Sequence, residues 1–269
     1  MKKRRLGRTG LQVAEVGLGA MDTPHSDEAA ETIRAALDAG MDFIDTAREY
    51  EGSEFLLGQV IRERGAGGFH IGSKTFRRSA SGAQYDVDRS LKVLGLSKLS
   101  LYQLHDISTP EAFDEVMAEG GALDGLKAAR YRGLIDFVGV SSHNLDVLPR
   151  LITSREFDTV MIEYSAFFPV TRPLLELAAK HDLGVIVMRP VGGSGRTTTM
   201  RGNMERGTAG VLTPRNLLRY VLSNPAVSVA IPGARHPSRV VENAATAANF
   251  VPMTDAEKQE LEEAAAALY

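Results

Sequence analysis

Short apolar runs alternate with stretches of helical periodicity along most of the chain, and this alternation is typical of parallel strand–helix–strand units. Two of the runs end at Lys74 and His105, and the others that we interpret as strands cover residues 15–18, 42–45, 136–140, 159–163, 184–188 and 228–231. Helical patterns lie between several of them, at residues 27–39, 81–94 and 122–132. Eight strands in this arrangement predict an α/β protein with a (β/α)8 TIM barrel.

The two ends of the chain carry features outside these eight units. A polar β-hairpin that turns at residues 8–10 is expected before the first barrel strand. Near the other end, Thr254 and Glu257 form a capping-box pattern that opens an extra C-terminal helix over residues 255–268, which we expect to pack across the barrel. We also expect Ser53 to be the N-cap of the helix that follows the second strand.

Length and composition fit a single barrel domain over residues 1–269, because such barrels typically run to ~250 residues. Cysteine is absent, which excludes disulfides and thiolate metal sites, and the six histidines show no metal-ligand spacing. The net charge of −3 provides no basic field for nucleic acid. No apolar run approaches the ~18 residues of a membrane span or forms a signal segment, so we expect a cytoplasmic protein that binds neither membrane nor nucleic acid.

Four polar residues fall at or near the ends of three successive predicted strands. Asp45 ends the second strand and Tyr50 follows it by five positions. Lys74 and His105 close the third and fourth strands at steps of about 30 residues, roughly one strand and one helix each. The barrel is therefore expected to bring all four side chains to one rim.

These residue types together suit proton donation to a carbonyl group. A phenol has a pKa near ~10, so its anion needs stabilisation, and an ammonium at Lys74 is expected to lower the pKa of Tyr50. Asp45 would hold that ammonium in place, and a neutral His105 would hydrogen-bond the carbonyl oxygen of a substrate. Taken alone, Asp45 could be a helix cap or a turn former, Tyr50 an interface residue and His105 a core histidine, but the four residue types at these positions together favour a catalytic role.

In this order and at these spacings, Asp45, Tyr50, Lys74 and His105 resemble the catalytic tetrad of the aldo-keto reductases. Further segments are similar to landmarks of that family, at residues 5–11, 17–19, 139–144 and 231–243. The similar segments together span about residues 3–248. The resemblance implies a barrel enzyme that transfers hydride between NADPH and an aldehyde or ketone, or the corresponding alcohol, with Tyr50 as the general acid and base.

The resemblance also implies where a cofactor binds, since residues 17–22 do not complete a Rossmann glycine fingerprint. Arg239, near the start of the last barrel helix, is expected to hold the 2′-phosphate of NADPH, with Glu242 and Asn243 against the adenine. The full set of implied cofactor contacts is Ser141, Ser142, Met188, Arg189, Pro232, Gly233, Ala234, Arg235, Arg239, Glu242 and Asn243.

Several positions depart from the family pattern. Gly233 and Ala234 replace a Lys-Ser pair at the phosphate site, which removes one charge but leaves NADPH favoured over NADH. Met161 stands where a Gln commonly holds the nicotinamide amide, and Met188 or Arg189 where a Tyr stacks on the ring. Residues 189–213 show no apolar periodicity, and we expect a mobile loop that clasps the cofactor.

The substrate pocket is expected to draw on residues that follow the strand ends: Met21, Asp22, Arg48, Glu49, Asp106, Phe167 and Phe168. The charged members suit a sugar or another hydroxylated carbonyl compound, whereas the two phenylalanines suit an apolar one, and both alternatives stay open. A second class of function is a non-catalytic barrel that binds nicotinamide nucleotide as a sensor or regulatory subunit, although the complete tetrad argues against it. The sequence gives no indication of oligomeric state.

Overall fold

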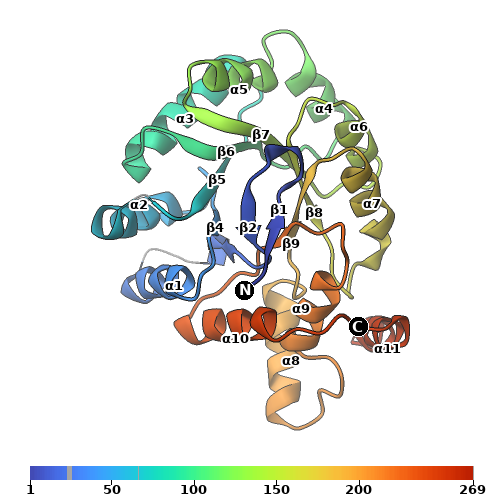
Figure 1. The fold of residues 1–269 in the computed structure, drawn as a ribbon. Coiled ribbons are helices and arrows are strands. Elements are labelled where there is room, and N and C mark those ends of the chain that lie inside the picture. Colours follow the sequence, from blue (N-terminus) through green and yellow to red (C-terminus); the bar gives the residue numbers. More distant parts are fainter. Residues whose placement is uncertain (23–25, 66, 269) are drawn as a thin grey trace.

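The computed structural model describes residues 1–22, 26–65 and 67–268 (Figure 1). Its strands are β1 (Lys3–Arg5), β2 (Gln12–Ala14), β3 (Leu18–Gly19), β4 (Phe43–Asp45), β5 (His70–Thr75), β6 (Leu99–Leu104), β7 (Ile135–Ser142), β8 (Thr159–Glu163), β9 (Gly184–Met188) and β10 (Val229–Ala230). Its α-helices are α1 (Asp27–Asp38), α2 (Ser53–Arg64), α3 (Ala80–Leu94), α4 (Pro110–Met117), α5 (Ala122–Tyr131), α6 (Leu148–Thr153), α7 (Arg172–Lys180), α8 (Ser194–Glu205), α9 (Pro214–Leu222), α10 (Pro237–Ala248) and α11 (Asp255–Ala266). Short 3-10 turns are η1 (Gly7–Thr9), η2 (Ala20–Asp22) and η3 (Pro169–Thr171).

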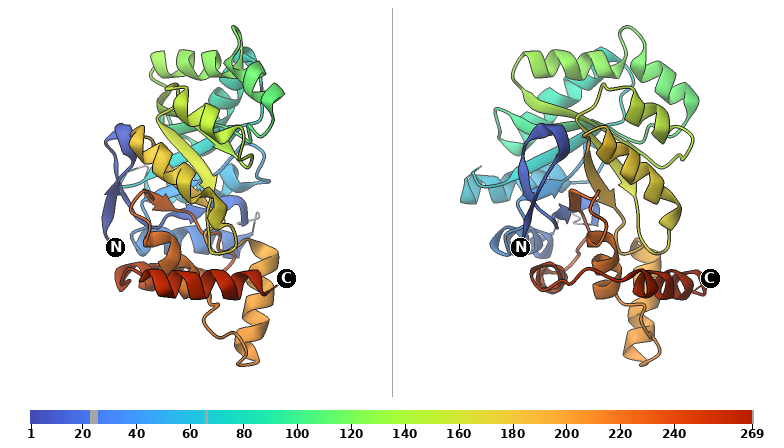
Figure 2. Two further views of the ribbon diagram at one scale, coloured as in Figure 1. Left: turned by 90° about the vertical axis from the view of Figure 1, so that its right-hand side faces the viewer. Right: turned by 45° about the vertical axis from the view of Figure 1, so that its right-hand side comes forward.

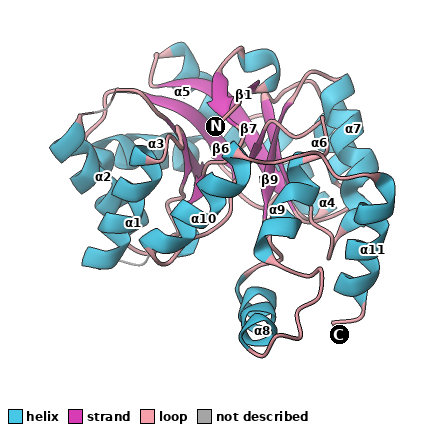
Figure 3. Ribbon diagram, turned by 60° about the horizontal axis from the view of Figure 1, so that its bottom comes forward, coloured by secondary structure: helices cyan, strands magenta, loops and turns pink. Residues whose placement is uncertain are grey.

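The eight strands from β3 to β10 form one parallel sheet in chain order. Parallel bridges from Val16 to Ala230 and from Gly19 to Gly233 join the two edges, so the sheet curls into a barrel. Helices surround it on the outside, as Figure 3 shows. The α/β fold with a (β/α)8 barrel is confirmed, and β1 and β2 form the expected N-terminal hairpin.

The junction between the first and last strands, which we call the seam (residues 15–19 and 229–233), requires glycine. A Cβ on Gly19 would lie 2.7 Å from the carbonyl oxygen of Ile231, across the seam. A Cβ on Gly17 would lie 2.3 Å from the carbonyl oxygen of Phe43 in β4. Since real Cβ atoms do not approach that closely, these two glycines serve the close approach of barrel strands.

The hairpin closes one end of the barrel (Figures 1 and 2). It contributes the buried Leu6 and Val13 to an inner core that also contains Phe43, Leu101, Met161, Ile186, Val229 and Ile231. Arg4 fastens the hairpin by donating hydrogen bonds to the carbonyl oxygens of Leu222 (2.7 Å) and Val227 (2.9 Å). A larger second core lies between the outer face of the sheet and the helices. One end of the barrel is therefore filled, which leaves the opposite rim for a ligand.

The start of α2 differs from the sequence prediction. Gly52, in the left-handed conformation with φ 70°, is the N-cap of this helix, and Ser53 is its first helical residue. The buried Ser53 hydroxyl instead bonds Thr46 Oγ1 (2.8 Å) and donates to the carbonyl oxygen of Ala20 (3.1 Å). The prediction that Ser53 caps α2 is wrong because that hydroxyl joins neighbouring loops at the rim.

Helix α8 occupies part of the segment expected to be a structureless loop, and it projects from the barrel next to α9 (Figures 1 and 3). Its sequence is rich in Gly, Thr and Arg, and Met200 is buried. Because no apolar stripe runs along the helix, no periodicity marks it in the sequence. The prediction of a structureless segment is wrong for these residues.

The C-terminal helix agrees with its capping pattern. The Thr254 hydroxyl accepts from the N–H of Glu257 (3.2 Å), and the Glu257 carboxylate accepts from the N–H of Thr254 (2.7 Å), which completes the capping box of α11. Arg172 of α7 pairs with Glu262 on this helix. Among the described residues, no helix is long and apolar enough to cross a membrane.

Candidate active site

The barrel brings the four predicted catalytic side chains to one rim. Asp45 is the last residue of β4, Lys74 lies near the end of β5, and His105 follows β6 directly. Tyr50 comes from the loop between β4 and α2. Parallel strands of a barrel end at the same rim, and the side chains of barrel enzymes that carry out chemistry lie there.

The buried ammonium of Lys74 is the centre of this arrangement. Its Nζ lies 2.6 Å from Asp45 Oδ2, 2.8 Å from the carbonyl oxygen of Thr46 and 3.2 Å from the hydroxyl oxygen of Tyr50. The Lys74 side chain is 0% exposed and that of Asp45 is 3% exposed. Gln103 of β6 donates to the other carboxylate oxygen of Asp45 at 3.2 Å. The lysine is thus held by an acid and presented to a phenol.

Burial and charge oppose each other in this cluster. Burial lowers the pKa of Lys74, but the charge of Asp45 and the contacts with Asp45 and Tyr50 outweigh it, so the pKa of the lysine is raised and it is protonated at neutral pH. Burial raises the pKa of Asp45, and the attraction of Lys74 offsets part of that shift. The contact between the two side chains thus offsets part of the cost of burying each charge.

The shift at Tyr50 has the opposite sign from the one expected. Burial raises the pKa of Tyr50, and the nearby charge of Lys74 offsets only part of this effect. The sequence expectation of a lowered pKa considered the ammonium and omitted the cost of removing the phenolate from water. The phenol is therefore held neutral at physiological pH, as a proton donor must be.

His105 stands beside the phenol, packed between aromatic groups. Its ring lies edge-on to Tyr50 with centroids 5.6 Å apart, and it stacks on Phe76 at 4.0 Å. Glu49 Oε2 lies 3.3 Å from His105 Nδ1. The imidazole is therefore fixed in place by three side chains.

Strained backbone follows two of the barrel strands at this rim. Asp106 after β6 has φ 54°, and Arg189 after β9 has φ 51°, although neither is glycine. The N–H of Asp106 donates to Ser141 Oγ (2.9 Å), and Arg78 donates to its carbonyl oxygen (3.1 Å). Such strain persists only where surrounding contacts hold it, and it is concentrated at functional sites.

A cavity of about 1120 Å³ opens at this rim and runs from the tetrad to α10. Asp45, Tyr50 and His105 line it. Eight of the expected cofactor residues also line it: Ser141, Met188, Arg189, Gly233, Ala234, Arg235, Arg239 and Asn243. Of the expected substrate residues, Met21, Glu49 and Asp106 line it. The volume exceeds that of a typical small-molecule pocket and has room for a dinucleotide beside a substrate.

Comparison with known proteins shows the family to which this chain belongs. The family model described as "Aldo/keto reductase family" matches residues 15–210, most of the chain. This chain belongs to the aldo/keto reductase family. An aldo-keto reductase of Mycobacterium avium is 31% identical over 241 residues, which cover 85% of this chain and 78% of the relative. L-galactose dehydrogenase of Arabidopsis thaliana is 26% identical over 281 residues, 90% of this chain and 86% of the relative.

A solved structure of the family has the same fold. The crystal structure of an aldo-keto reductase from Klebsiella pneumoniae in complex with NADPH is 24% identical, with a TM-score of 0.77. The match covers 97% of this chain and 94% of that one. The resemblance seen in the sequence is confirmed at the level of family and fold.

Three of the cofactor contacts expected for an aldo/keto reductase fall outside the cavity wall. The Ser142 hydroxyl, fully buried, accepts from the N–H of Asn144 (3.1 Å). The carbonyl oxygen of Pro232 accepts from Gly19 N–H at the seam (3.1 Å). Glu242, on the surface of α10, forms ion pairs with Arg201 of α8 and Arg239 of α10. Each of these residues supports neighbouring structure.

Three of the expected substrate residues also point elsewhere. Arg48 turns toward the buried carboxylates of Glu54 and Asp86, because they attract its charge away from the cavity. Phe167 lies under the guanidinium of Arg196, whose Cζ is 5.2 Å from its ring centroid. Phe168 precedes η3 as its N-cap and does not line the cavity. The side chain of Asp22 lies outside the described part of the chain.

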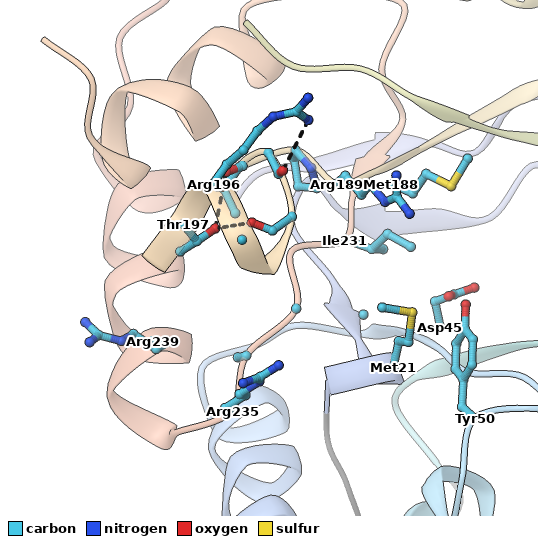
Figure 4. A pocket seen from close by; sticks show the side chains of 18 of the residues that line it. Met21, Asp45, Tyr50, Met188, Arg189, Arg196, Thr197, Ile231, Arg235 and Arg239 are labelled. Atoms are coloured by element: carbon cyan, nitrogen blue, oxygen red, sulfur yellow. Dashed lines mark hydrogen bonds between the residues drawn. The ribbon is translucent and has the colours of Figure 1, made fainter. Parts of the chain in front are cut away.

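The structure adds functional candidates that the sequence did not reveal. Glu163, at the end of β8, contacts Arg189 (3.1 Å), His143 (3.4 Å) and Arg196 (3.9 Å). Arg196 lies in the first turns of α8, on the cavity wall, as Figure 4 shows. In the sequence, Glu163 belongs to a mostly apolar predicted strand. Only its position as the last residue of that strand could have indicated that its side chain lies at the rim. The contact with Arg196 links the start of α8 to the end of β8.

The far end of the cavity is rich in guanidinium groups. Figure 4 shows Arg235 and Arg239 on the side of the pocket opposite Asp45 and Tyr50. Arg201 of α8 also lines the cavity. Among the described residues, no group of three or more His, Cys, Asp or Glu is arranged to hold a metal ion.

Proposed function

We propose that this aldo/keto reductase transfers hydride between NADP(H) and an aldehyde or ketone, or the corresponding alcohol, with Tyr50 as general acid and base. The observation that carries this proposal is the contact of one buried ammonium, Lys74, with both Asp45 and the Tyr50 hydroxyl at the wall of a large cavity. On this proposal residues 1–269 act as one barrel domain.

Tyr50 donates its proton to the carbonyl oxygen of the substrate as negative charge develops there. Lys74 then stabilises the phenolate, since its Nζ lies 3.2 Å from the phenol oxygen. Asp45 keeps that ammonium oriented, and His105 contributes a ring nitrogen beside the same phenol. When bound, the nicotinamide supplies or accepts the hydride. In alcohol oxidation the same residues run the proton transfer in reverse.

The donors at the far end of the cavity fit the additional phosphate of NADPH. Arg239 Nη1 lies 2.8 Å from Glu242 Oε1, and Arg201 Nη2 lies 3.3 Å from Glu242 Oε2. Two guanidiniums on one carboxylate are close enough for a phosphate to bind both, and a dianion is the stronger acceptor. Arg201 from α8 thus provides the charge that Gly233 and Ala234 lack. The Klebsiella relative was solved with NADPH, which agrees with this choice.

For the substrate we propose a small hydroxylated carbonyl compound, such as a sugar or its aldehyde. Glu49, Asp106 and His143 place hydrogen-bonding groups on the cavity wall near the tetrad. Met21 and Phe76 add exposed apolar surface beside them. By its name the relative from Arabidopsis thaliana is a dehydrogenase of the sugar L-galactose.

The function is tested by mixing the protein with NADPH and a panel of hydroxylated and apolar aldehydes and following the dihydronicotinamide absorbance. D-glyceraldehyde and 4-nitrobenzaldehyde represent the two classes. Turnover supports the enzyme, and a higher kcat/KM for the hydroxylated class supports the substrate proposal. Tight NADPH binding with no turnover across the panel contradicts the enzyme and supports the sensor. The structure favours the enzyme in advance of this test, because a sensor would not need a neutral phenol beside an ammonium.

A further inference from the structure

A carboxylate occupies one nitrogen of the His105 imidazole. Glu49 Oε2 lies 3.3 Å from His105 Nδ1, while Glu49 Oε1 accepts a hydrogen bond from the N–H of Phe76 at 3.2 Å. The Phe76 ring in turn stacks on the imidazole with an interplanar angle of 21°. Acid, ring and backbone therefore form one interlocked unit on the cavity wall.

The charge of Glu49 decides which nitrogen of His105 carries a proton. Burial raises the pKa of Glu49, but the hydrogen bonds from His105 and from the N–H of Phe76 outweigh burial, so its pKa is below the usual value. Glu49 is therefore ionised at neutral pH, and an ionised carboxylate only accepts hydrogen bonds. Consequently Nδ1 must be the donor in this contact.

The other nitrogen is the one left for a substrate. Within the part of the chain that the structure describes, Nε2 of His105 has no hydrogen-bond partner. In the neutral ring with a proton on Nδ1, Nε2 presents a lone pair. A carbonyl oxygen also has only lone pairs, so the two would repel, whereas an alcohol could donate its hydroxyl proton. A neutral His105 donating to the carbonyl, as expected from the sequence, does not fit this geometry.

We propose that Glu49 is a positioning residue that fixes the Nδ1–H form of His105, so that the cationic ring assists carbonyl reduction and the neutral ring assists alcohol oxidation. This inference rests on the proposed function of the same site. It gives the two directions of the reaction opposite dependence on pH through one side chain.

Several other charged or titratable groups face His105. They are Asp45 on β4, Tyr50 on the following loop, Lys74 on β5, the adjacent Asp106, and Arg78, which donates to the His105 carbonyl oxygen at 3.1 Å. Two of them also respond to Glu49, because its charge acts to raise the pKa of Tyr50 and of Arg78. The pH profile of a Glu49 variant is therefore interpreted together with a measurement that reports the His105 ring alone.

The test is the pH profile of kcat/KM for reduction of 4-nitrobenzaldehyde by NADPH, in wild type and in Glu49→Gln. A glutamine amide can donate to Nδ1, which allows a neutral ring with its proton on Nε2. The ratio of variant to wild-type kcat/KM should rise at least about tenfold between about pH 6 and about pH 9. A ratio that is constant with pH would overturn the proposal, since a merely structural role lowers activity by the same factor throughout.

A second measurement does not depend on turnover. Nitrogen-15 NMR of the imidazole, assigned with His105→Gln, should show the neutral ring protonated on Nδ1 in wild type and shifted toward Nε2 in Glu49→Gln. A wild-type ring protonated on Nε2 would overturn the proposal even if the variant is inactive. Glu51→Gln is the matched control, because Glu51 is an exposed carboxylate of the same loop that does not line the cavity. Absence of any wild-type turnover would instead count against the proposed function.

Discussion

Lys74 and Asp45 form an ion pair, 2.6 Å between Nζ and Oδ2, at a place in the barrel that solvent does not reach. Removing one partner of such a pair leaves an uncompensated buried charge. We expect Lys74→Met to lower the free energy of unfolding by about 3–5 kcal/mol, measured by urea denaturation. The double variant Lys74→Met with Asp45→Asn should recover part of this loss. Strict additivity of the two losses would contradict the coupling.

The role of Tyr50 predicts a selective loss of chemistry. Tyr50→Phe removes the proton donor but keeps the ring that packs against His105. We expect kcat to fall by at least about 100-fold, the lower end for general acid catalysis. The Kd for NADPH, followed by fluorescence quenching, should stay within about twofold because this change is small and remote from the arginines. A loss of kcat below that range would contradict the assigned role.

The two arginines on Glu242 predict cofactor selectivity. Arg239→Ala and Arg201→Ala should each weaken NADPH binding by about 1.5–3 kcal/mol, the scale of a charged hydrogen bond, and leave NADH nearly unchanged. Arg206→Ala is the matched control for Arg201→Ala. Arg206 is the C-cap of the same helix, α8, its guanidinium donates to Asn203, and it does not line the cavity. Isothermal titration with each nucleotide measures the difference. Equal losses for both nucleotides would remove the phosphate assignment.

Glu163 predicts a pH-dependent contribution to stability. Burial raises its pKa, but the contacts with His143, Arg189 and Arg196 outweigh burial, so the pKa is below the usual 4.5. A lowered carboxylate pKa contributes stability that is present above the unfolded value and is lost as pH falls through the folded value. Wild type should therefore be more stable than Glu163→Gln at pH 7, and the gap should narrow only below about pH 4.5. A gap that is independent of pH would show that the charge is irrelevant.

The barrel and the position of the four tetrad residues at one rim could be predicted from the sequence, because the spacing of the strands sets which residues reach the rim. The direction in which individual side chains point could not be predicted in this way. Arg48 lies only two positions before Tyr50, yet it turns toward buried acids from α2 and α3 that no local pattern reveals. Arg201 and Glu242 are far apart in the sequence, and their pairing depends on how α8 docks on α10. Long-range charge pairs therefore carry the part of the site that periodicity does not encode.

The two strands that complete the barrel, β3 and β10, are each only two residues long, and few hydrogen bonds join them. Gly19 on one side of this junction and Gly233 and Ala234 on the other face the same cavity. A nucleotide bound there would contact both the first and the last strand of the barrel and so join the two ends of the chain. The resistance of the protein to heat and to proteases would then increase with the fraction of molecules that have nucleotide bound. A shortage of nucleotide in the cell would therefore also lower the amount of this enzyme.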